Sequence, residues 1–316
     1  MRTFRGRMHE YKYVAIDYFN EPVLDATSFF LSHCHEDHLD GLDSEAFRNR
    51  LEIEFLFEGT EGTVLYMGDN RLTVSNVRRM PALHDIHCLK SIQSVYFDST
   101  FCNEDTSWLP NRIDSLMAVH GTASKWLREN ESHRILLYLP YKYGFEFLLI
   151  KLAELFKQKI HVKETLLKAY KNIPKLKNVI TENARETQLH ACTSGCICDE
   201  SQDSFIKSEM NDKNVLVIKP SVLWFVKNEK NRNEIILKTE SKSGPLYRLL
   251  YCNHTSLDET ISLLKYLQPQ YAIACDLPWN STIEKMDTLL QKRLSKIRTI
   301  LRSVPNANFY NSTEEE

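Results

Sequence analysis

The chain has 316 residues, of which 42% are hydrophobic and 26% charged, and its formal net charge is −2. This composition is ordinary for a globular protein, and the nearly neutral charge excludes the uniformly basic surface typical of many nucleic-acid-binding domains. No apolar run approaches the ~20 residues of a membrane-spanning helix, and no apolar core of a signal peptide follows the basic N-terminus. Eight cysteines in such a chain favour thiols and metal ligands over disulfides, so we expect a protein of the cytosol or nucleus.

Two short apolar runs near the N-terminus predict strands. The first lies at residues 13–19 and ends at Asp17 or just after it, and the second lies at residues 28–31. Polar residues follow both strands: Asp17 follows the first, and a histidine-rich segment follows the second.

A dense group of metal-binding residue types follows the second strand. Within six residues the chain carries His33, His35, Asp37 and His38. Imidazole and carboxylate are the ligands that Zn²⁺ prefers where a site must stay open for chemistry. In an irregular loop the first two side chains can point to one side and the last two to the other, so one loop can supply ligands to two neighbouring metals. A histidine-rich surface loop is the alternative, and the spacing favours metal binding.

Two later strands also end at carboxylates. Residues 54–57 and 64–67 flank a Gly-containing turn, which predicts a hairpin whose second strand ends at Gly68 and Asp69. Residues 94–97 predict a strand that runs into three polar side chains, Asp98, Ser99 and Thr100. We therefore expect Asp69 and Asp98 at the same rim of a sheet.

Strands and helices alternate along the rest of the chain, which predicts a layered α/β fold. Strands are expected at 135–139, 215–218, 234–237, 248–251 and 271–274, and helices at 44–51, 145–156, 257–267 and 283–301. The last helix has an apolar stripe and basic faces, so packing on its own domain is preferred to binding of nucleic acid or a membrane. Residues 199–214 are charged and nearly free of apolar residues, which predicts the least ordered segment.

Together these motifs resemble the β-CASP branch of the metallo-β-lactamase-fold nucleases. The matching segments occur in the family's order at 15–17, 30–38, 62–72, 91–98, 143–146, 188–192 and 218–225, followed by His254. The resemblance implies a metallo-β-lactamase αββα sandwich, incomplete here, with an inserted β-CASP α/β cap domain. It places the sandwich at residues 1–106 and 240–303, the cap at 107–239, and a flexible tail at 304–316.

The resemblance also implies roles for the polar residues. One metal would take His33, His35, Asp69 and a further histidine, and the other would take Asp37, His38, Asp69 and His254. Asp17 and Asp98 would support the ligands, and Ser99 and Thr100 would face the phosphate. Apart from the resemblance, Lys219 belongs to a basic cluster near Trp224 and Phe225, with Lys227, Lys230 and Arg232, that is expected to contact DNA phosphates; a solvated charged loop is an equal alternative. Asp17, Asp37, Asp69 and Asp98 are then the expected catalytic carboxylates. The metals would be Zn²⁺, with Mg²⁺ or Mn²⁺ as alternatives at the second position, and the reaction would be metal-assisted phosphodiester hydrolysis.

One motif of the family is absent from the sequence. Between His38 and Asp69 the chain has no histidine, so the motif that supplies the fourth ligand of the first metal is missing. Residues 48–52 resemble the family's early helix and residues 54–57 resemble the strand that follows the missing motif. A block is therefore excised near Ile53, and its lost strands would leave sheet edges unpaired.

A second metal site is expected in the cap. Its ligands would be His161, His190, Cys192 and either Cys196 or Cys198, a set that resembles the structural zinc site of DNA-repair members of the family. Four nitrogen and sulfur ligands that close a tetrahedron suit structural Zn²⁺. Reduced, unrelated thiols are the alternative, which the crowding of three cysteines within seven residues disfavours.

The expected function is hydrolysis of DNA hairpins, overhangs and damaged ends in double-strand-break or cross-link repair in the nucleus. DNA is the expected partner, together with DNA-repair kinase and ligase complexes and no membrane. A catalytically impaired DNA-binding or regulatory product of the same lineage is the main alternative, because the histidine block is missing. A hydrolase of small molecules is disfavoured, because the cap motifs resemble those of nucleases.

Overall fold

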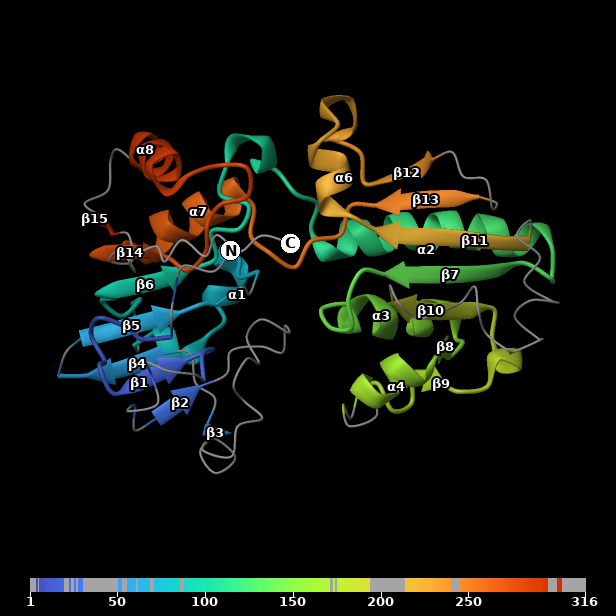
Figure 1. The fold of residues 1–316 in the computed structure, drawn as a ribbon, viewed down its shortest axis with the longest axis horizontal. Coiled ribbons are helices and arrows are strands. Elements are labelled where there is room, and N and C mark those ends of the chain that lie inside the picture. The colour runs from blue at the N-terminus through green and yellow to red at the C-terminus, as the bar shows by residue number, and fades with distance from the viewer. Residues whose placement is uncertain are drawn as a thin grey trace, which may run out of the picture. The chain divides into compact units, whose positions relative to one another are not determined.

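The computed structural model describes residues 4, 6–19, 23, 26, 28–30, 51–52, 56–60, 62–68, 71–85, 88–170, 173, 175–193, 214–239, 245–294 and 300–302. The chain forms two compact units, one from residues 1–108 and 253–316 and the other from residues 109–252 (Figure 1). No helix among the described residues is long and apolar enough to cross a membrane.

The first unit contains a five-stranded sheet and a smaller three-stranded sheet. The larger has the order β15-β14-β6-β5-β4, formed by β15 (Ile300–Arg302), β14 (Tyr271–Ala274), β6 (Ser94–Phe97), β5 (Gly62–Tyr66) and β4 (Leu56–Gly59). Its neighbours are parallel except for the β4–β5 hairpin. The smaller sheet pairs β1 (Val14–Ile16), β2 (Ser28–Phe30) and β3 (Leu51–Glu52) in parallel.

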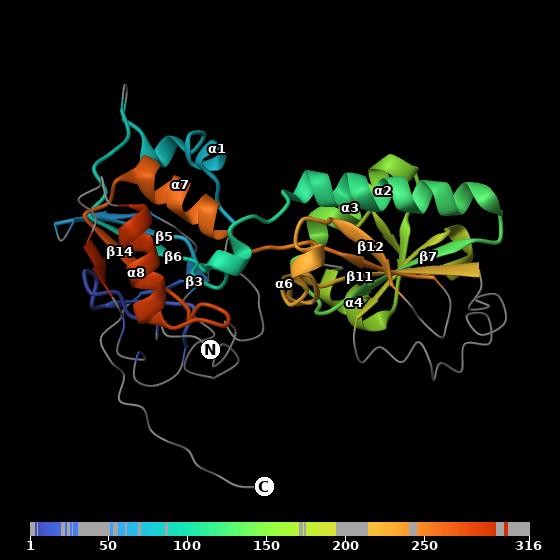
Figure 2. The same cartoon turned by 90° about the horizontal axis from the view of Figure 1, so that it is seen from above.

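Both faces of the larger sheet are buried, which explains why its strands are continuous apolar runs. Leu65, Val95 and Phe97 lie in a core with the helices α1 (Val74–Val77), α7 (Leu257–Leu267) and α8 (Ile283–Arg293). The alternate residues lie in a second core, which Ile16 of the smaller sheet enters. The unit is therefore layered, with helices on one side of the large sheet and the small sheet on the other (Figure 2).

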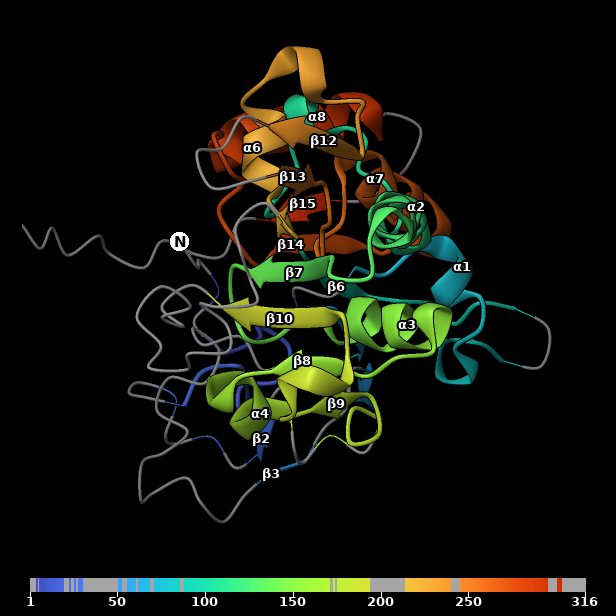
Figure 3. The ribbon, with the colours of Figure 1, turned by 90° about the vertical axis from the view of Figure 1, so that its right-hand side faces the viewer.

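The second unit is built on one seven-stranded sheet with the order β12-β13-β11-β7-β10-β8-β9. The strands are β7 (Arg134–Leu139), β8 (Ile160–Val162), β9 (Ile180–Thr181), β10 (Leu189–Thr193), β11 (Val215–Pro220), β12 (Ile236–Thr239) and β13 (Leu246–Leu249). All neighbours are parallel except β12 and β13. Helices α2 (Arg112–Glu129) and α3 (Glu146–Phe156) cover one face, and α4 (Glu164–Tyr170) and α6 (Val222–Val226) lie on the other (Figure 3).

The unit boundary differs from the expected domain boundary. The return to the first unit was expected at residue 240, but the structure places it at residue 253. The reason is that β13 pairs with β11, and β12 with β13, so both strands extend the cap sheet. The expected tail at 304–316 lies outside the described residues.

Most of the expected elements are present. The hairpin, the strands at β6, β7, β11 and β14, and the helices α3 and α7 are confirmed, and β12 and β13 are each displaced by two residues from their expected positions. The expected helix at 283–301 is wrong beyond Arg293, because residues 300–302 form an edge strand that pairs with β14. The helix expected at 44–51 lies outside the described residues except for Leu51, which starts the strand β3 instead. The poorly ordered stretch expected at 199–214 lies outside them except for Asn214.

An ion pair ties the two chain segments of the first unit together. The Arg71 guanidinium contacts both carboxylate oxygens of Glu259 at 2.9–3.1 Å across 188 residues of sequence. The side chains are 4% and 23% exposed. Glu259 also accepts from the backbone N–H of Ser256 in the capping box that starts α7. One carboxylate therefore both begins a helix and anchors the segment before α1.

Replacement of Arg71 by alanine leaves a largely buried carboxylate without its cation. We expect Arg71→Ala to lower the free energy of unfolding by about 2–3 kcal/mol, because breaking a buried pair exposes the cost of an unpaired charge. Chemical denaturation of the full chain measures this loss. Arg293→Ala is the matched control, because Arg293 pairs with Asp258 at 2.6 Å with both side chains about half exposed. The control should lose less than about 0.5 kcal/mol, and equal losses would contradict the prediction.

Candidate functional site

Asp98 lies at the centre of the hydrogen bonds that follow β6. Its side chain is buried, and its Oδ1 accepts from the backbone N–H of Thr100 at 3.0 Å. Its Oδ2 accepts from Nδ1 of His254 at 3.1 Å and from the backbone N–H of Thr255 at 3.2 Å. The carboxylate thus joins the end of β6 to the loop that precedes α7.

This contact fixes the state of the His254 ring. A carboxylate accepts the Nδ1–H, so the proton lies on Nδ1 and Nε2 carries the lone pair with which an imidazole can bind a metal. The Phe101 ring packs edge-on against His254 with centroids 5.7 Å apart, which limits its rotation. The side chain of His254 is 17% exposed. The geometry is the one that a supporting carboxylate and a metal-binding histidine require.

Asp17 occupies the corresponding position after β1. It is buried, its Oδ2 accepts from the Tyr66 hydroxyl at 3.1 Å, and its backbone N–H donates to the carbonyl of Phe30 at 2.8 Å. Its φ of 54° lies in the left-handed region, which costs free energy for any residue except glycine. Such strain is typical of a residue held in place by its surroundings at a functional site.

The two hydroxyls after Asp98 have different environments. The Ser99 hydroxyl is fully buried, donates to the carbonyl of Asp276 at 2.6 Å and accepts from the N–H of Asp276 at 3.0 Å. Its hydrogen-bonding capacity is therefore used to hold the loop after β14. Thr100 is partly exposed. The phosphate contact expected of both residues stays a prediction, and the exposure favours Thr100.

The other expected ligands of the active site lie outside the described residues, namely His33, His35, Asp37, His38 and Asp69, and so do Cys196 and Cys198 of the expected zinc site. Among the residues that are described, no group of three or more His, Cys, Asp or Glu side chains is placed to hold a metal ion.

Part of the expected zinc site can be tested in the cap. His161 and His190 are register partners on β8 and β10, both are buried, and their Nδ1 atoms lie 3.1 Å apart. Two imidazole nitrogens bound to one tetrahedral Zn²⁺ lie about 3.3 Å apart, because each Zn–N bond is ~2.0–2.1 Å. Burial and the neighbouring His161 lower the pKa of His190 to about 3, so this imidazole is neutral. Nε2 of His190 is buried without a partner.

Cys192 completes the described part of this set. It lies two residues after His190 on β10, so the two side chains share one face of the sheet, and it is buried. The donor types and the spacing of the two imidazoles fit a structural Zn²⁺ that receives its fourth ligand from the segment after β10.

Lys219 lies on a row of cationic and aromatic side chains across the cap sheet. Its Nζ is 4.6 Å from the centroid of the Tyr138 ring on β7. Arg248, its register partner on β13, has its guanidinium carbon 6.0 Å from the centroid of Trp224 in α6. All four side chains are partly exposed. The sequence pointed to Lys219 and Trp224, but Arg248 and Tyr138 join them only through strand register.

Comparisons with known proteins agree with this architecture. Residues 174–275 match the family model described as DNA repair metallo-beta-lactamase. Over 92% of its length the chain is 30% identical to Protein artemis of Gallus gallus and 28% identical to Protein artemis of Homo sapiens, of which it covers 50% and 51%. It is also 28% identical to the 5′ exonuclease Apollo of Mus musculus, over 69% of this chain and 35% of that protein. The chain thus spans about half the length of the Artemis proteins it matches.

The layered α/β units and these matches agree with a metallo-β-lactamase fold that carries a β-CASP cap. The chain is similar to the DNA repair metallo-β-lactamase family. Its similarity to the Artemis proteins agrees with the resemblance that the sequence motifs predicted.

The alignment with human Artemis also bears on the missing block. It runs over 363 residues, which exceeds the 316 residues of this chain, so it passes over positions that this chain lacks. Such gaps are expected if a block near Ile53 is absent.

The role of Asp98 leads to a specific prediction. Asp98→Asn removes the negative charge that faces His254. In one of the two orientations of the amide, its N–H₂ group would also face the N–H groups of His254 and Thr255, so both hydrogen bonds would be lost. We expect the affinity for Zn²⁺ at the site of His254 to fall about 10–100-fold, as for other residues that orient metal ligands. Competition with a chromophoric chelator measures this affinity. Asp258→Asn on the exposed face of α7 is the control, and a similar change in both variants would contradict the role.

Proposed function

We propose that the chain is a metal-dependent nuclease that hydrolyses phosphodiester bonds of DNA. The observation that carries the proposal is the buried Asp98 carboxylate at the carboxyl end of β6, which accepts the Nδ1–H of His254 and so leaves the proton off Nε2. In a parallel sheet this end is where ligands bind. The similarity to DNA-repair proteins supports the same reaction class, since one relative is named a 5′ exonuclease.

We assign the following roles in metal binding and catalysis to the residues of this chain. His33, His35 and Asp69 would hold one metal, and Asp37, His38, Asp69 and His254 the other. Bound divalent metals, Zn²⁺ or at the second position Mg²⁺ or Mn²⁺, would supply a water of lowered pKa and neutralise charge on the phosphate. Asp98 holds the His254 ring and its proton on Nδ1, and Asp17 lies buried at the end of β1. Thr100 would face the phosphate, together with Ser99 if its bonds to Asp276 open.

The substrate class follows from the relatives. We infer that the chain acts on DNA ends such as hairpins, overhangs and damaged ends in double-strand-break or cross-link repair, in the nucleus. DNA-repair kinase and ligase complexes are the partners that this role implies. The row of Lys219, Arg248, Tyr138 and Trp224 suits a nucleic-acid strand, because cations attract phosphates and aromatic faces accept stacked bases.

The missing histidine motif favours a second candidate. With only His33, His35 and Asp69 left for the first metal, the chain would be a DNA-binding or regulatory protein that retains the fold but cleaves slowly or not at all. Asp98 and His254 belong to the part that both candidates retain, so their geometry does not separate the two.

Metal content and cleavage measured on one sample separate the two candidates. For a nuclease we expect about two or more active-site and structural metals per chain, with cleavage of a hairpin-ended duplex that Asp37→Ala abolishes. About one zinc per chain and no cleavage would instead support the non-catalytic candidate. In that case, restoring a histidine-containing block at Ile53 and retesting cleavage identifies the lost block as the cause.

We further propose that His161, His190, Cys192 and either Cys196 or Cys198 bind one structural Zn²⁺ in the cap. The two neutral imidazoles of His161 and His190, which contact each other, would both bind the metal. A ligand from the segment after β10 would then link that segment to the sheet.

Removal of either ligand should release this metal. We expect His190→Ala and Cys192→Ser each to lose about one equivalent of zinc and to lower the Tm, because the binding free energy of a structural metal is part of the folding free energy. Elemental analysis and thermal melting measure both effects. Cys88→Ser is the control, because Cys88 is an exposed free cysteine of the other unit. Unchanged zinc content in the two ligand variants would refute the site.

A further inference from the structure

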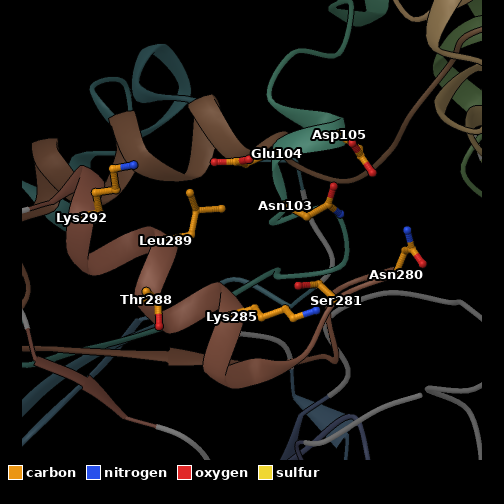
Figure 4. A pocket seen from close by; sticks show the side chains of 9 residues that line it. All are labelled: Asn103, Glu104, Asp105, Asn280, Ser281, Lys285, Thr288, Leu289 and Lys292. Carbon is orange, nitrogen blue, oxygen red and sulfur yellow. The ribbon is translucent and has the colours of Figure 1, made fainter.

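A polar pocket of about 410 Å³ lies in the first unit beside the candidate site (Figure 4). One wall is formed by Asn103, Glu104 and Asp105, which follow β6. The other wall is formed by α8, from which Lys285, Leu289 and Lys292 extend. The loop after β14 contributes Asn280 and Ser281. Neither the sequence motifs nor the proposed metal ligands account for this pocket.

The pocket belongs to the same sheet edge as Asp98. β6 and β14 are parallel neighbours, so the loops that follow them leave from one edge. The N–H of Trp279 donates to the carbonyl of Thr100 at 2.7 Å, and Nδ2 of Asn103 donates to the carbonyl of Trp279 at 2.9 Å. These bonds fix the pocket wall to the loop that carries Asp98. A polymer bound at Asp98 and His254 therefore has the pocket within reach.

The charges of the pocket indicate the chemistry of its ligand. Two lysines and two carboxylates line the pocket, so its formal charges cancel and it has no preference for a simple anion. A ligand with both an anionic group and hydrogen-bond donors matches it better. The carboxylates of Glu104 and Asp105 can accept hydrogen bonds from the donors of such a ligand.

A nucleotide has the required groups. Its phosphates are anions that lysines can contact, and its base carries amino and imino donors as well as carbonyl acceptors. The Leu289 side chain between the two lysines offers an apolar surface to the base (Figure 4). The volume falls within the range of small-molecule pockets, which is ~300–1,000 Å³.

We propose that this pocket receives one unpaired nucleotide of the DNA strand that is bound at Asp98 and His254. The base lies against Asn103 and Leu289, and Lys285 and Lys292 contact the flanking phosphates. The inference rests on the proposed function, and it adds the side chains that would hold one nucleotide of an overhang.

Binding of a fluorescent duplex with a single-stranded overhang tests the two lysines. The full chain carrying Asp37→Ala prevents cleavage, and anisotropy gives the Kd. We expect Lys285→Ala with Lys292→Ala to raise the Kd roughly tenfold and to reduce the salt slope by about 0.7 for each lost phosphate contact. Lys265→Ala, an exposed lysine of α7, is the charge-matched control and should change the Kd less than about twofold.

An abasic residue placed in turn at each overhang position tests the base. At one position we expect binding to weaken about fivefold or more, because a base–side-chain contact is lost. Leu289→Trp fills the pocket without a change of charge, and binding by this variant should not depend on the abasic residue. Thermal melting confirms that the variant folds.

Three outcomes would overturn the proposal. If the unaltered chain cleaves DNA and all pocket variants bind DNA with the same Kd, the pocket is not a DNA subsite, and the nuclease function is unaffected. This is also the result expected if the pocket binds a protein. If a free deoxynucleoside monophosphate binds the pocket as tightly as the overhang, its ligand is not a DNA strand. If the unaltered chain neither binds nor cleaves DNA, the proposal and the proposed function both fail.

Discussion

The candidate site depends on the parallel pairing of β6 with β14 and on the carboxylate that follows β6. The pairing brings the ends of two strands to one edge, although one strand precedes the cap unit and the other follows it. Asp98 then bridges to His254, 156 residues further along the chain. The first unit resumes at residue 253, immediately before His254, so the whole cap is inserted between a supporting carboxylate and the histidine that it orients. Arg71 and Glu259 close the same unit near the start of α7.

The sequence predicted those elements whose local signals agreed with their packing. α7 has a capping box at its start and a regular apolar stripe, and β6 is a short apolar run between polar residues. α2 was not predicted, because Gly121 and several small polar residues weaken its stripe, and packing of residues such as Val119 against the cap sheet stabilises it instead. The stripe of the C-terminal helix continues to Leu301, yet pairing with β14 gives residues 300–302 an extended conformation. A tertiary contact overrode a local periodicity there.

Site residues were predictable where a strand ends in a polar group, because parallel strands gather their ends at one edge. That reasoning predicted Asp17 and Asp98 at strand ends, whereas His254 was predicted through the resemblance. It did not find that the Ser99 hydroxyl is bound on both sides by the backbone of Asp276, since Asp276 belongs to none of the motifs. Strand register is the other feature that the sequence did not predict. His161 faces His190, and Arg248 lies beside Lys219, through pairings of β8 with β10 and of β11 with β13 that periodicity does not specify.

The position of the missing block explains why a shortened chain can retain this architecture. The block would have stood near Ile53, between β3 and β4. Among the described strands, β3 ends the smaller sheet and β4 ends the larger one. A loss at this point would remove strands from the edges of two sheets together with one expected ligand loop, and the central strands β5, β6 and β14 are paired with one another. The cores on both faces of the large sheet draw mainly on these central strands and on α7, so their packing does not require the block. Such a loss would act on the first expected metal position. Asp98 and His254 lie elsewhere, after β6 and before α7, and β6 is paired on both sides by β5 and β14.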